Sequence, residues 1–380
     1  MRVKVEREVL LTALQRVQGI VEKRNTMPSL ANVLLEAKKD GLDVSATDLE
    51  LGMRGLYKAA VEEPGSVTFS ARKLYEILKE ITDQEIAMTV TEDCLVSITT
   101  ARGEFKVVGL PSKDFPPLPA IERDGLIPLP GTGLLQLIRK TLFAVGDNDT
   151  RYVLNGLLIV VTSADGTPII RLVGTDGHRL AMAEQKLEGE KKESADAQEE
   201  NVQEEKVIVP KKAATEIRRL LEEDEDEPMI GFTKNMLIFR KSGLVLTSRL
   251  MEGNYPNYQQ VIPKAGSKQI AVNRDDLEGA LRRVSVLSQN KTYAVKLTFS
   301  EKAITLLSSH PDMGEANEEI PASFNGEEFS AGFNARYLLD VLSVMGSETV
   351  MLNMEASLSP CLIREKDNPM FKAVVMPVKV

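Results

Sequence analysis

Three stretches of the chain repeat one pattern, in which a strand-like entry leads into an amphipathic helix. They read Phe69-Ser-Ala-Arg-Lys-Leu-Tyr-Glu-Ile-Leu, Val209-Pro-Lys-Lys-Ala-Ala-Thr-Glu-Ile-Arg-Arg-Leu-Leu and Phe333-Asn-Ala-Arg-Tyr-Leu-Leu-Asp-Val-Leu. In each stretch a helix-capping residue or Pro stands where strand spacing gives way to helical spacing. A segment that recurs three times predicts a fold built from three similar units.

A second helical stretch precedes each of these and also repeats. These stretches read Leu10-Leu-Thr-Ala-Leu-Gln-Arg-Val, Leu134-Leu-Gln-Leu-Ile-Arg-Lys-Thr-Leu and Leu277-Glu-Gly-Ala-Leu-Arg-Arg-Val. Apolar spacing thus predicts helices at about 7–24, 71–81, 132–145, 210–221, 274–287 and 334–344. Elsewhere strand-like alternation dominates, as at 41–46, 67–70 and 237–240. The repeated unit is therefore about 120 residues of helix, strands, helix and strands.

The repeat predicts the fold class and the domains. Because the helices are too few to cover parallel crossovers, we expect an α+β fold with antiparallel sheets. Pro-rich segments from Lys113 and from Asn254 are typical of short extended linkers between domains. The expected domains are residues 1–120, 128–253 and 257–380, and the 380-residue chain is long enough for a core in each.

Composition excludes several classes of protein. Two cysteines, Cys94 and Cys361, exclude a disulfide framework and a thiolate-rich zinc site, and two histidines leave little for imidazole metal sites. The absence of Trp argues against a base-stacking platform for single strands. No apolar run approaches the roughly 18 residues of a membrane span, and the N-terminus lacks a signal peptide's apolar block. We expect a cytoplasmic protein with no metal, no cofactor and no membrane partner.

The net charge of −9 is unevenly distributed. Residues 188–206 carry a net −5 and residues 222–227 a net −6, so the rest of the chain nets +2. The first segment has no apolar period and is typical of a solvated or disordered acidic loop. The averaged charge therefore does not exclude a nucleic-acid partner.

Basic residues concentrate on the predicted helices, which together carry a net +8. They are Arg16, Lys23, Arg24, Arg72, Lys73, Lys79, Arg139, Lys140, Lys211, Lys212, Arg218, Arg219, Arg282 and Arg283. Basic helices that faced a duplex would meet its phosphates without reading its bases. Because no helix shows the Asn, Gln and Arg cluster of a recognition helix, any binding of duplex DNA is expected to be sequence-independent.

Catalytic motifs are absent, since no phosphate loop, G-x-G-x-x-G or G-x-S-x-G occurs. His178 could serve as a general base, but no nucleophile motif accompanies it, and a turn at a strand end is the simpler interpretation. Asp48 and Asp176 occupy equivalent Thr-Asp positions in two repeats, which favours a structural turn role. We predict that the protein is not an enzyme.

The sequence resembles the bacterial DNA sliding clamp, the β subunit of DNA polymerase III, along its whole length. The motifs that carry the resemblance are Arg24-Asn-Thr-Met-Pro-Ser-Leu-Ala-Asn, Arg151-Tyr-Val-Leu-Asn-Gly, Thr175-Asp-Gly-His-Arg-Leu-Ala, Arg249-Leu-Met-Glu-Gly-Asn-Tyr-Pro-Asn-Tyr-Gln-Gln-Val-Ile-Pro, Gly332-Phe-Asn-Ala-Arg-Tyr-Leu and Val374-Val-Met-Pro-Val-Lys-Val. The resemblance implies a head-to-tail homodimer that forms a closed ring of clamp domains around duplex DNA, with helices lining the hole. Such a processivity factor tethers the replicative polymerase.

The resemblance also implies a hydrophobic groove that binds short linear motifs of the replicative polymerase, the clamp loader and repair polymerases. The matching residues are Leu154, Thr175, Gly177, His178, Arg179, Leu180, Pro256, Val261, Asn334, Tyr337, Leu358, Pro360, Val374, Val375, Met376, Pro377 and Val378. For the apolar members, an ordinary place in the core is the alternative. An apolar C-terminal tail nonetheless suits a pocket wall.

DNA-facing and interface residues complete the expectation. The resemblance places Arg24, Asn148 and Tyr152 toward DNA, and charge alone adds Lys73, Arg139, Lys140, Lys211, Arg218 and Arg282. At the ring interface, Phe105 and Val107 would meet Val286 and Leu287 of the partner by edge-strand pairing and apolar packing.

The chain departs from the family in its long acidic loop at 188–206 and in Gln260, which stands where a basic residue is often found. Three alternatives stay open at the level of sequence. One is an enzyme built around His178 and Asp176, one is a protein-only scaffold that uses the same groove, and one is a resistance paralogue that does not act in replication.

Overall fold

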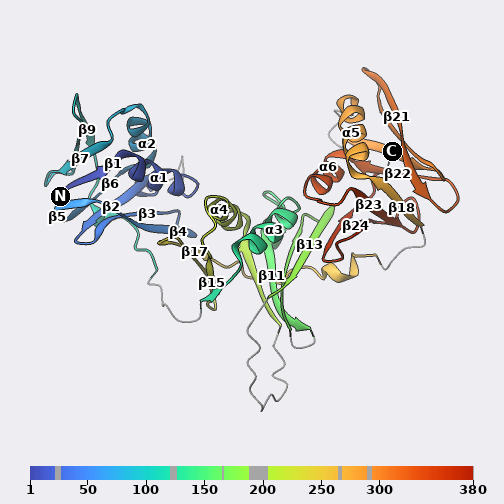
Figure 1. The fold of residues 1–380 in the computed structure, drawn as a ribbon, viewed down its shortest axis with the longest axis horizontal. Helices are drawn as coiled ribbons and strands as arrows, with labels where there is room; N and C mark the ends of the chain where they lie inside the picture. The colour runs from blue at the N-terminus through green and yellow to red at the C-terminus, as the bar shows by residue number, and fades with distance from the viewer. Residues whose placement is uncertain are drawn as a thin grey trace, which may run out of the picture. The chain divides into compact units, whose positions relative to one another are not determined.

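The computed structural model describes residues 1–21, 27–119, 126–164, 167–187, 204–263, 268–288 and 293–379. Arg24 and most of the acidic loop predicted at 188–206 lie outside these residues. The chain packs as two compact units, residues 1–132 with 215–250, and residues 133–214 with 251–380 (Figure 1).

The first unit contains two antiparallel sheets and the helices of the first repeat, α1 (Arg7–Val17), α2 (Ala71–Glu80), η1 (Pro28–Ala31) and η2 (Ser112–Asp114). One sheet has the order β5 (Ala60–Glu63), β1 (Arg2–Glu6), β7 (Glu85–Val90), β8 (Leu95–Thr99), β9 (Glu104–Val108). The other has the order β10 (Ile127–Pro128), β15 (Met229–Phe232), β16 (Met236–Lys241), β17 (Leu244–Arg249), β4 (Leu51–Tyr57), β3 (Gly41–Thr47), β2 (Asn32–Lys38), β6 (Gly65–Ser70).

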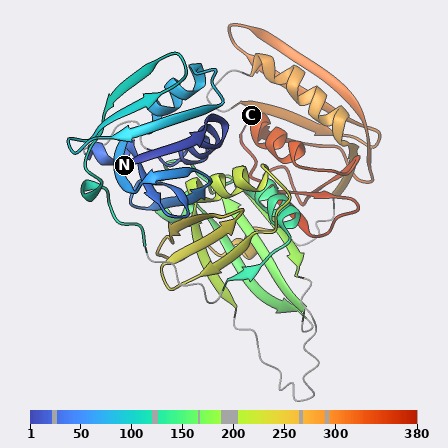
Figure 2. The same ribbon diagram turned by 60° about the vertical axis from the view of Figure 1, so that its left-hand side comes forward.

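The second unit is built on one long antiparallel sheet. Its order is β14 (Glu205–Pro210), β11 (Gly156–Ala164), β12 (Thr167–Thr175), β13 (Arg179–Lys186), β25 (Phe371–Val375), β24 (Cys361–Glu365), β23 (Thr349–Met354), β18 (Lys268–Asn273), β21 (Gly314–Phe324), β20 (Ala303–His310), β19 (Ala294–Phe299), β22 (Phe329–Asn334). Its helices include α5 (Arg274–Val284), α6 (Ala335–Ser343), η3 (Tyr152–Asn155), η4 (Tyr258–Gln260) and η5 (Ser285–Leu287). Figure 2 shows α5 and α6, in orange and red, packed next to each other.

Helices α3 (Gly131–Leu142) and α4 (Lys211–Leu221) each contain a boundary between the two units. The predicted threefold pattern is confirmed in the buried helix positions, because Leu10, Leu134 and Leu277 are buried at the same place in α1, α3 and α5. The predicted caps are also present. The side chains of Ser70 and Asn334 accept hydrogen bonds from the first-turn amides of α2 and α6, and Asn273, which was not predicted as a cap, does the same for α5.

The helix predicted at 7–24 is too long. Helix α1 ends at Val17, and Gly19 follows its C-cap. Gly favours helix termination, and a Cβ at Gly19 would lie only 1.9 Å from Oε1 of Glu216. The helices predicted at 132–145 and 274–287 also end early, at Leu142 and Val284, and the second continues as the 3₁₀ turn η5.

The repeats are joined edge to edge by strand pairing. Strand β4 of the first repeat pairs with β17 of the second, and β13 of the second pairs with β25 of the third. All strand pairs of the described residues are antiparallel, which confirms the predicted class. Because strands of different repeats share the same sheets, the boundaries of the two compact units do not coincide with the predicted domain limits. The predicted domain limits therefore stay a prediction.

Candidate functional site

A mainly apolar cavity of about 220 Å³ lies in the second unit, where the end of β12, the start of β13 and the end of β25 meet. Residues predicted for the groove form most of its lining, namely Leu154, Thr175, Gly177, Arg179, Leu180, Pro256, Val261, Val374 and Met376. Two further lining residues, Arg151 and Tyr258, were not predicted. Both stand inside quoted motifs, beside Tyr152 and after Pro256, and that proximity was the available signal.

The turn between β12 and β13 shapes one wall of the cavity. Thr175 Oγ1 accepts a hydrogen bond from Gly177 N (3.0 Å) and donates one to Arg179 O (2.6 Å). Asp176 Oδ1 accepts from the amides of His178 and Arg179 at 2.9 and 3.0 Å. Gly177 adopts φ +82°, a conformation that favours glycine. The predicted turn role of Asp176 is thus confirmed, and Asp48 makes the equivalent bonds to the amides of Glu50 and Leu51.

Arg179 is held in place on several sides. Its guanidinium pairs with Asp176 (3.0 Å) and with Asp340 of α6, and it lies 4.5 Å from the ring centroid of Tyr337. Such a stacked and paired guanidinium loses little further freedom on binding a ligand. Arg179 therefore forms a rigid wall, and Tyr337 contacts it without lining the cavity itself.

The cavity floor belongs to the core. Leu180, Val374 and Tyr258 are buried in one apolar cluster, which also contains Leu158 and Met182. The Tyr258 hydroxyl accepts a hydrogen bond from Arg171, which also pairs with Glu184 at 2.7 Å. The floor is therefore preformed, as small-ligand sites usually are.

The C-terminal tail contributes Met376 to the cavity wall. After β25, Met376 N donates to His178 O (2.9 Å) and Val378 N donates to Gly332 O (2.9 Å). These bonds tie Met376, which lines the cavity, between the turn and β22. The predicted members outside the lining are His178, Asn334, Tyr337, Leu358, Pro360, Val375, Pro377 and Val378. Among these, Leu358 is exposed beside β24, Val375 is buried, and Asn334 caps α6.

The predicted DNA-facing residues differ in how far their side chains are exposed to solvent. Lys73 and Arg282 extend into solvent with 68% and 66% of their side chains exposed, and Tyr152 and Asn148 are also exposed. Arg139 lies in the last turn of α3 and Arg218 is half-buried in α4. Lys211 and Lys140 instead form ion pairs with carboxylates of the protein itself.

Two predicted DNA contacts, Lys211 and Lys140, are engaged in ion pairs, and their side chains are less exposed than those of Lys73 and Arg282. Lys211 Nζ lies 2.8 Å from Asp147 Oδ1 and donates to Val145 O. Lys140 Nζ lies 2.9 Å from Glu365 Oε2, with 16% and 2% of the two side chains exposed. A buried, paired ammonium offers less charge to a phosphate than an exposed one. Lys73 and Arg282 also form ion pairs on their own helices, with Glu76 at 2.9 Å and Glu278 at 2.6 Å, but their side chains stay exposed, which makes them better candidates for DNA contact.

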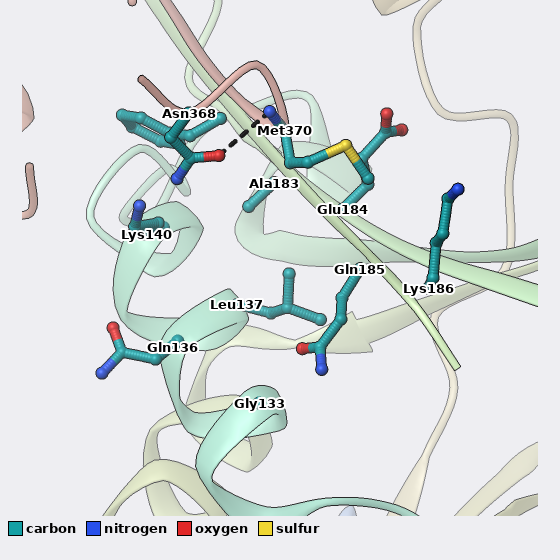
Figure 3. Close-up of a pocket in the computed structure, with 11 residues that line it drawn as sticks. Gly133, Gln136, Leu137, Lys140, Ala183, Glu184, Gln185, Lys186, Asn368 and Met370 are labelled. Atoms are coloured by element: carbon teal, nitrogen blue, oxygen red, sulfur yellow. Dashed lines mark hydrogen bonds between the residues drawn. The ribbon is translucent and has the colours of Figure 1, made fainter. Parts of the chain in front are cut away.

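A second cavity, of about 290 Å³, lies next to this pair, lined by one face of α3 and by the strand ends of β13 and β25 (Figure 3). Asn368 Oδ1 accepts from Met370 N at 3.1 Å there, and Asn368 Nδ2 donates to Glu365. Glu365 Oε1 also accepts from Gly346 N. Burial alone would raise the pKa of the Glu365 carboxyl, but the hydrogen bonds from Gly346 and Lys140 outweigh it and hold the pKa below its ordinary value.

Stability of the second unit is expected to decrease through Glu365 as the solution becomes acidic. Because the folded-state pKa is lowered, the contribution is complete above the ordinary Glu pKa of about 4.3 and is lost as pH falls through the lower folded value. The substitution Glu365→Gln removes this pH-dependent contribution to stability. The test is the urea midpoint measured from about pH 6 to about pH 3 in both proteins. Parallel curves would contradict the prediction.

The predicted interface residues are exposed or half-buried, and two of them lie on an edge strand. Strand β9 ends its sheet, and its Phe105 is 40% exposed while Val107 is half-buried. In η5, Val286 is 61% exposed and Leu287 half-buried. An apolar edge strand of this kind invites pairing with another chain.

Neither a metal site nor a membrane span emerges from the described part of the chain. Its residues hold no group of three or more potential His, Cys, Asp or Glu ligands. None of its helices combines the length and apolar character that crossing a bilayer requires. Asp176, one half of the alternative acid–base pair, has both carboxylate oxygens engaged by the turn and by Arg179.

Comparison with known proteins gives a consistent result over the whole chain. Models of the N-terminal, central and C-terminal domains of the DNA polymerase III beta subunit match residues 1–119, 128–257 and 259–379. The chain is 35% identical to the beta sliding clamp of Caulobacter vibrioides, with all of both chains covered. It is 36% identical to that of Pseudomonas aeruginosa, with 99% of each covered.

Solved structures agree. The DNA polymerase III subunit beta from Pseudomonas aeruginosa matches all of both chains with a TM-score of 0.89 and 34% identity. A sliding clamp from Bartonella birtlesii bound to griselimycin matches with a TM-score of 0.92 and 34% identity, again over all of both chains. The Caulobacter crescentus beta sliding clamp, solved with polyethylene glycol bound, gives 0.90 and 36% over the same full coverage.

Proposed function

Because the chain belongs to the DNA polymerase III beta subunit family, the bacterial sliding clamps, its function is that of a processivity factor, and we propose that two copies close head to tail into a ring around duplex DNA. The observation that supports this most strongly is the succession of three clamp domains in family order on a threefold repeat. A ring that encircles DNA is held by topology, so weak phosphate contacts suffice and leave it free to slide.

The cavity lined by Leu180, Val374 and Met376 is the proposed docking site for short peptide motifs. Its apolar floor and rigid Arg179 wall suit an extended apolar peptide with a few polar anchors. The Bartonella birtlesii clamp is bound to griselimycin, which supports a ligand-binding surface in this family. We assign the site to the replicative polymerase, the clamp loader and repair polymerases, which would compete for it.

The clamp itself carries no catalytic role in this proposal, and it requires no cofactor. Asp176 and His178, the alternative catalytic pair, serve the turn that shapes the groove. The work of the protein is to hold polymerases on DNA in the cytoplasm, where the chromosome is copied.

DNA contact through exposed helix residues is tested by salt dependence. The double variant Lys73→Ala with Arg282→Ala should bind duplex DNA more weakly at low salt, and the slope of log K against log salt should become shallower by about one for each phosphate that is no longer neutralised. Lys302→Ala, in the exposed turn between β19 and β20, is the matched control of a non-helical lysine. Equal slopes for all variants and wild type would contradict the assignment.

Processivity is tested by primer extension on a primed single-stranded circle with polymerase and clamp loader. At limiting polymerase and with excess unprimed trap DNA, adding this protein should shift products from short to full-length. Products of unchanged length, with an authentic clamp active in the same assay, would contradict the proposed function.

A further inference from the structure

We propose that the first unit contains a second copy of the docking site, where β4 of the first repeat meets β17 of the second, and that Leu118 of the linker keeps this copy closed. With Leu118 removed, the copy would accept the same class of ligand as the open cavity, a short apolar peptide. The inference rests on the docking role proposed for the cavity lined by Leu180 and Val374, and it assigns the equivalent place in the first unit.

The turn between β3 and β4 reproduces the turn that shapes the open cavity. Thr47 Oγ1 accepts a hydrogen bond from Leu49 N (3.0 Å) and donates one to Leu51 O (3.0 Å), and Thr175 makes the same two bonds in its own turn. Leu49 adopts φ +80°, and Gly177 adopts φ +82°. A leucine seldom adopts this conformation, so the hydrogen bonds of the turn hold it there. The backbone of the docking turn is therefore present in both units.

The strands that follow the two turns are paired in the same register. Gly52 of β4 is opposite Thr247 of β17, and Leu180 of β13 is opposite Val374 of β25. Gly52 and Leu180 each lie five residues after the threonine of their turn. Gly52 is thus the counterpart of Leu180, and Thr247 is the counterpart of Val374. The two apolar residues that form the floor of the open cavity are replaced by a glycine and a threonine.

A backbone hydrogen bond beyond the paired strands also recurs. Arg249 N donates to Glu50 O (2.8 Å), and Met376 N donates to His178 O (2.9 Å). Arg249 is therefore the counterpart of Met376, and its side chain is exposed. A cation stands where the open cavity has an apolar wall, so the first junction favours an apolar ligand that also carries a negative charge.

The linker after the first repeat has the same pattern as the linker that contributes to the open cavity. The segments Phe115-Pro116-Pro117-Leu118 and Tyr255-Pro256-Asn257-Tyr258 both consist of an aromatic residue, a proline, a variable residue and a large residue that packs inward. Pro256 and Tyr258 line the open cavity. By this alignment Leu118 is the counterpart of a lining residue.

Leu118 packs directly over Gly52. A Cβ built on Gly52 would lie 2.6 Å from Leu118 Cδ2 and 3.1 Å from Thr247 Oγ1. Leu118 therefore occupies the space that a side chain at position 52 would take, and it is half-buried there. The missing side chain of the floor leaves a hollow, and the linker fills this hollow from the same chain.

The neighbouring charges explain why the two linkers differ. At the open cavity, Arg171 donates to the Tyr258 hydroxyl (3.2 Å), which anchors the ring in the floor, and Arg171 also pairs with Glu184 at 2.7 Å. The spacing of 128 residues that relates the two turns places Asp43 and Leu56 at the equivalent cross-strand pair. With a carboxylate in place of the guanidinium, the first junction has an apolar leucine where the open cavity has an anchored tyrosine.

Dye binding tests whether Leu118 closes an apolar hollow. The probe is anilinonaphthalene sulfonate, whose apolar rings suit the hollow and whose sulfonate suits the exposed Arg249. Titrated with the full-length protein, Leu118→Ala should bind about one more dye molecule per chain than wild type. Adding Gly52→Leu, which refills the hollow, should abolish the additional site. Pro117→Ala, at the exposed neighbouring position in the linker, is the matched control and should bind as wild type does.

A peptide competition tests the ligand class of the opened copy. An acetylated peptide of residues 113–119 should displace the additional dye from the Leu118→Ala protein. The same peptide carrying the Leu118→Ala change should not displace it, because it lacks the apolar side chain that fills the hollow. Equal displacement by both peptides would overturn the role of Leu118.

A packing cycle gives a readout that needs no ligand. Gly52→Ala should lower the urea midpoint of the wild-type protein, because the new Cβ would meet Leu118 Cδ2 at 2.6 Å. In the Leu118→Ala background the same change should lower the midpoint at most about half as far, since the two sites share one contact. Equal shifts in the two backgrounds would overturn the closure. Leu118→Val, a smaller change, serves in both tests if Leu118→Ala does not fold.

The outcomes separate this inference from the proposed function. An unchanged dye stoichiometry in Leu118→Ala, or an additional site that persists after Gly52→Leu, would overturn the closed copy and leave the open cavity and the clamp function intact. A wild-type protein that fails to lengthen primer-extension products would instead overturn the proposed function, whatever the dye titration gives.

Discussion

Deleting residues 376–380 is expected to weaken binding of a short apolar peptide motif at the proposed docking site about 100-fold while leaving the protein folded. Met376 forms one wall of the cavity and is held there by the bond from its amide to His178 O. Burying a Met side chain contributes up to about 3 kcal/mol, and about 2.7 kcal/mol corresponds to 100-fold in affinity. Binding is measured by calorimetry with the full-length dimer.

The deletion begins immediately after Val375, the last residue of β25, so this core strand and its pairing with β13 and β24 are retained. Lys379→Ala, an exposed change within the deleted segment, is the matched control and should bind normally. Equal affinity of the deletion and the wild type would remove the tail from the docking site. Unchanged sedimentation of the deletion variant shows that any loss comes from the cavity and not from the interface.

Replacing Lys140→Met is expected to destabilise the strand that carries Glu365 by about 3–5 kcal/mol, because it leaves a buried carboxylate without its cation. The effect should be local to β24 and its neighbours, so it is measured by native-state hydrogen exchange of the peptide that contains Cys361–Glu365. Combining Lys140→Met with Glu365→Gln should recover most of the loss, since Gln can still accept from Gly346 N.

The same variants also separate the structural role of Lys140 from its predicted contact with DNA. If Lys140→Met left exchange at β24 unchanged and lowered affinity for duplex DNA, the ion pair with Glu365 would not be the main role of this residue. If exchange rises and the low-salt DNA affinity stays near that of wild type, the basic surface of the clamp depends on exposed residues such as Lys73 and Arg282.

Much of the fold could be predicted from sequence because the threefold repeat aligns the three units with one another. Capping residues such as Ser70 and Asn334 and the buried Leu10, Leu134 and Leu277 mark equivalent helices. Helix ends were less predictable. Helix α1 ends at Val17, and a Cβ at the following Gly19 would collide with Glu216, a tertiary constraint that leaves no periodic signal in the sequence.

The pairing of β4 with β17 and of β13 with β25 could not be predicted, since edge-to-edge contacts between repeats join segments far apart in the chain. For the same reason the partner of Lys140 was hidden, because Glu365 lies 225 residues away. Groove residues such as Thr175 and Leu180 were predicted correctly because they belong to a motif that carries the resemblance. Arg151 and Tyr258 were missed, although they stand in the same motifs as the predicted groove residues Leu154 and Pro256.

Retention on DNA tests the ring most directly. The protein is loaded with a clamp loader onto nicked circular plasmid, gel-filtered at high salt, and filtered again after the plasmid is linearised. A ring should stay on the circle and leave the linear form, whereas electrostatic binding would be lost from both because phosphate contacts weaken steeply with salt. Loss from both forms, in a reaction where an authentic clamp is retained on the circle, would contradict encirclement and favour a protein-only scaffold.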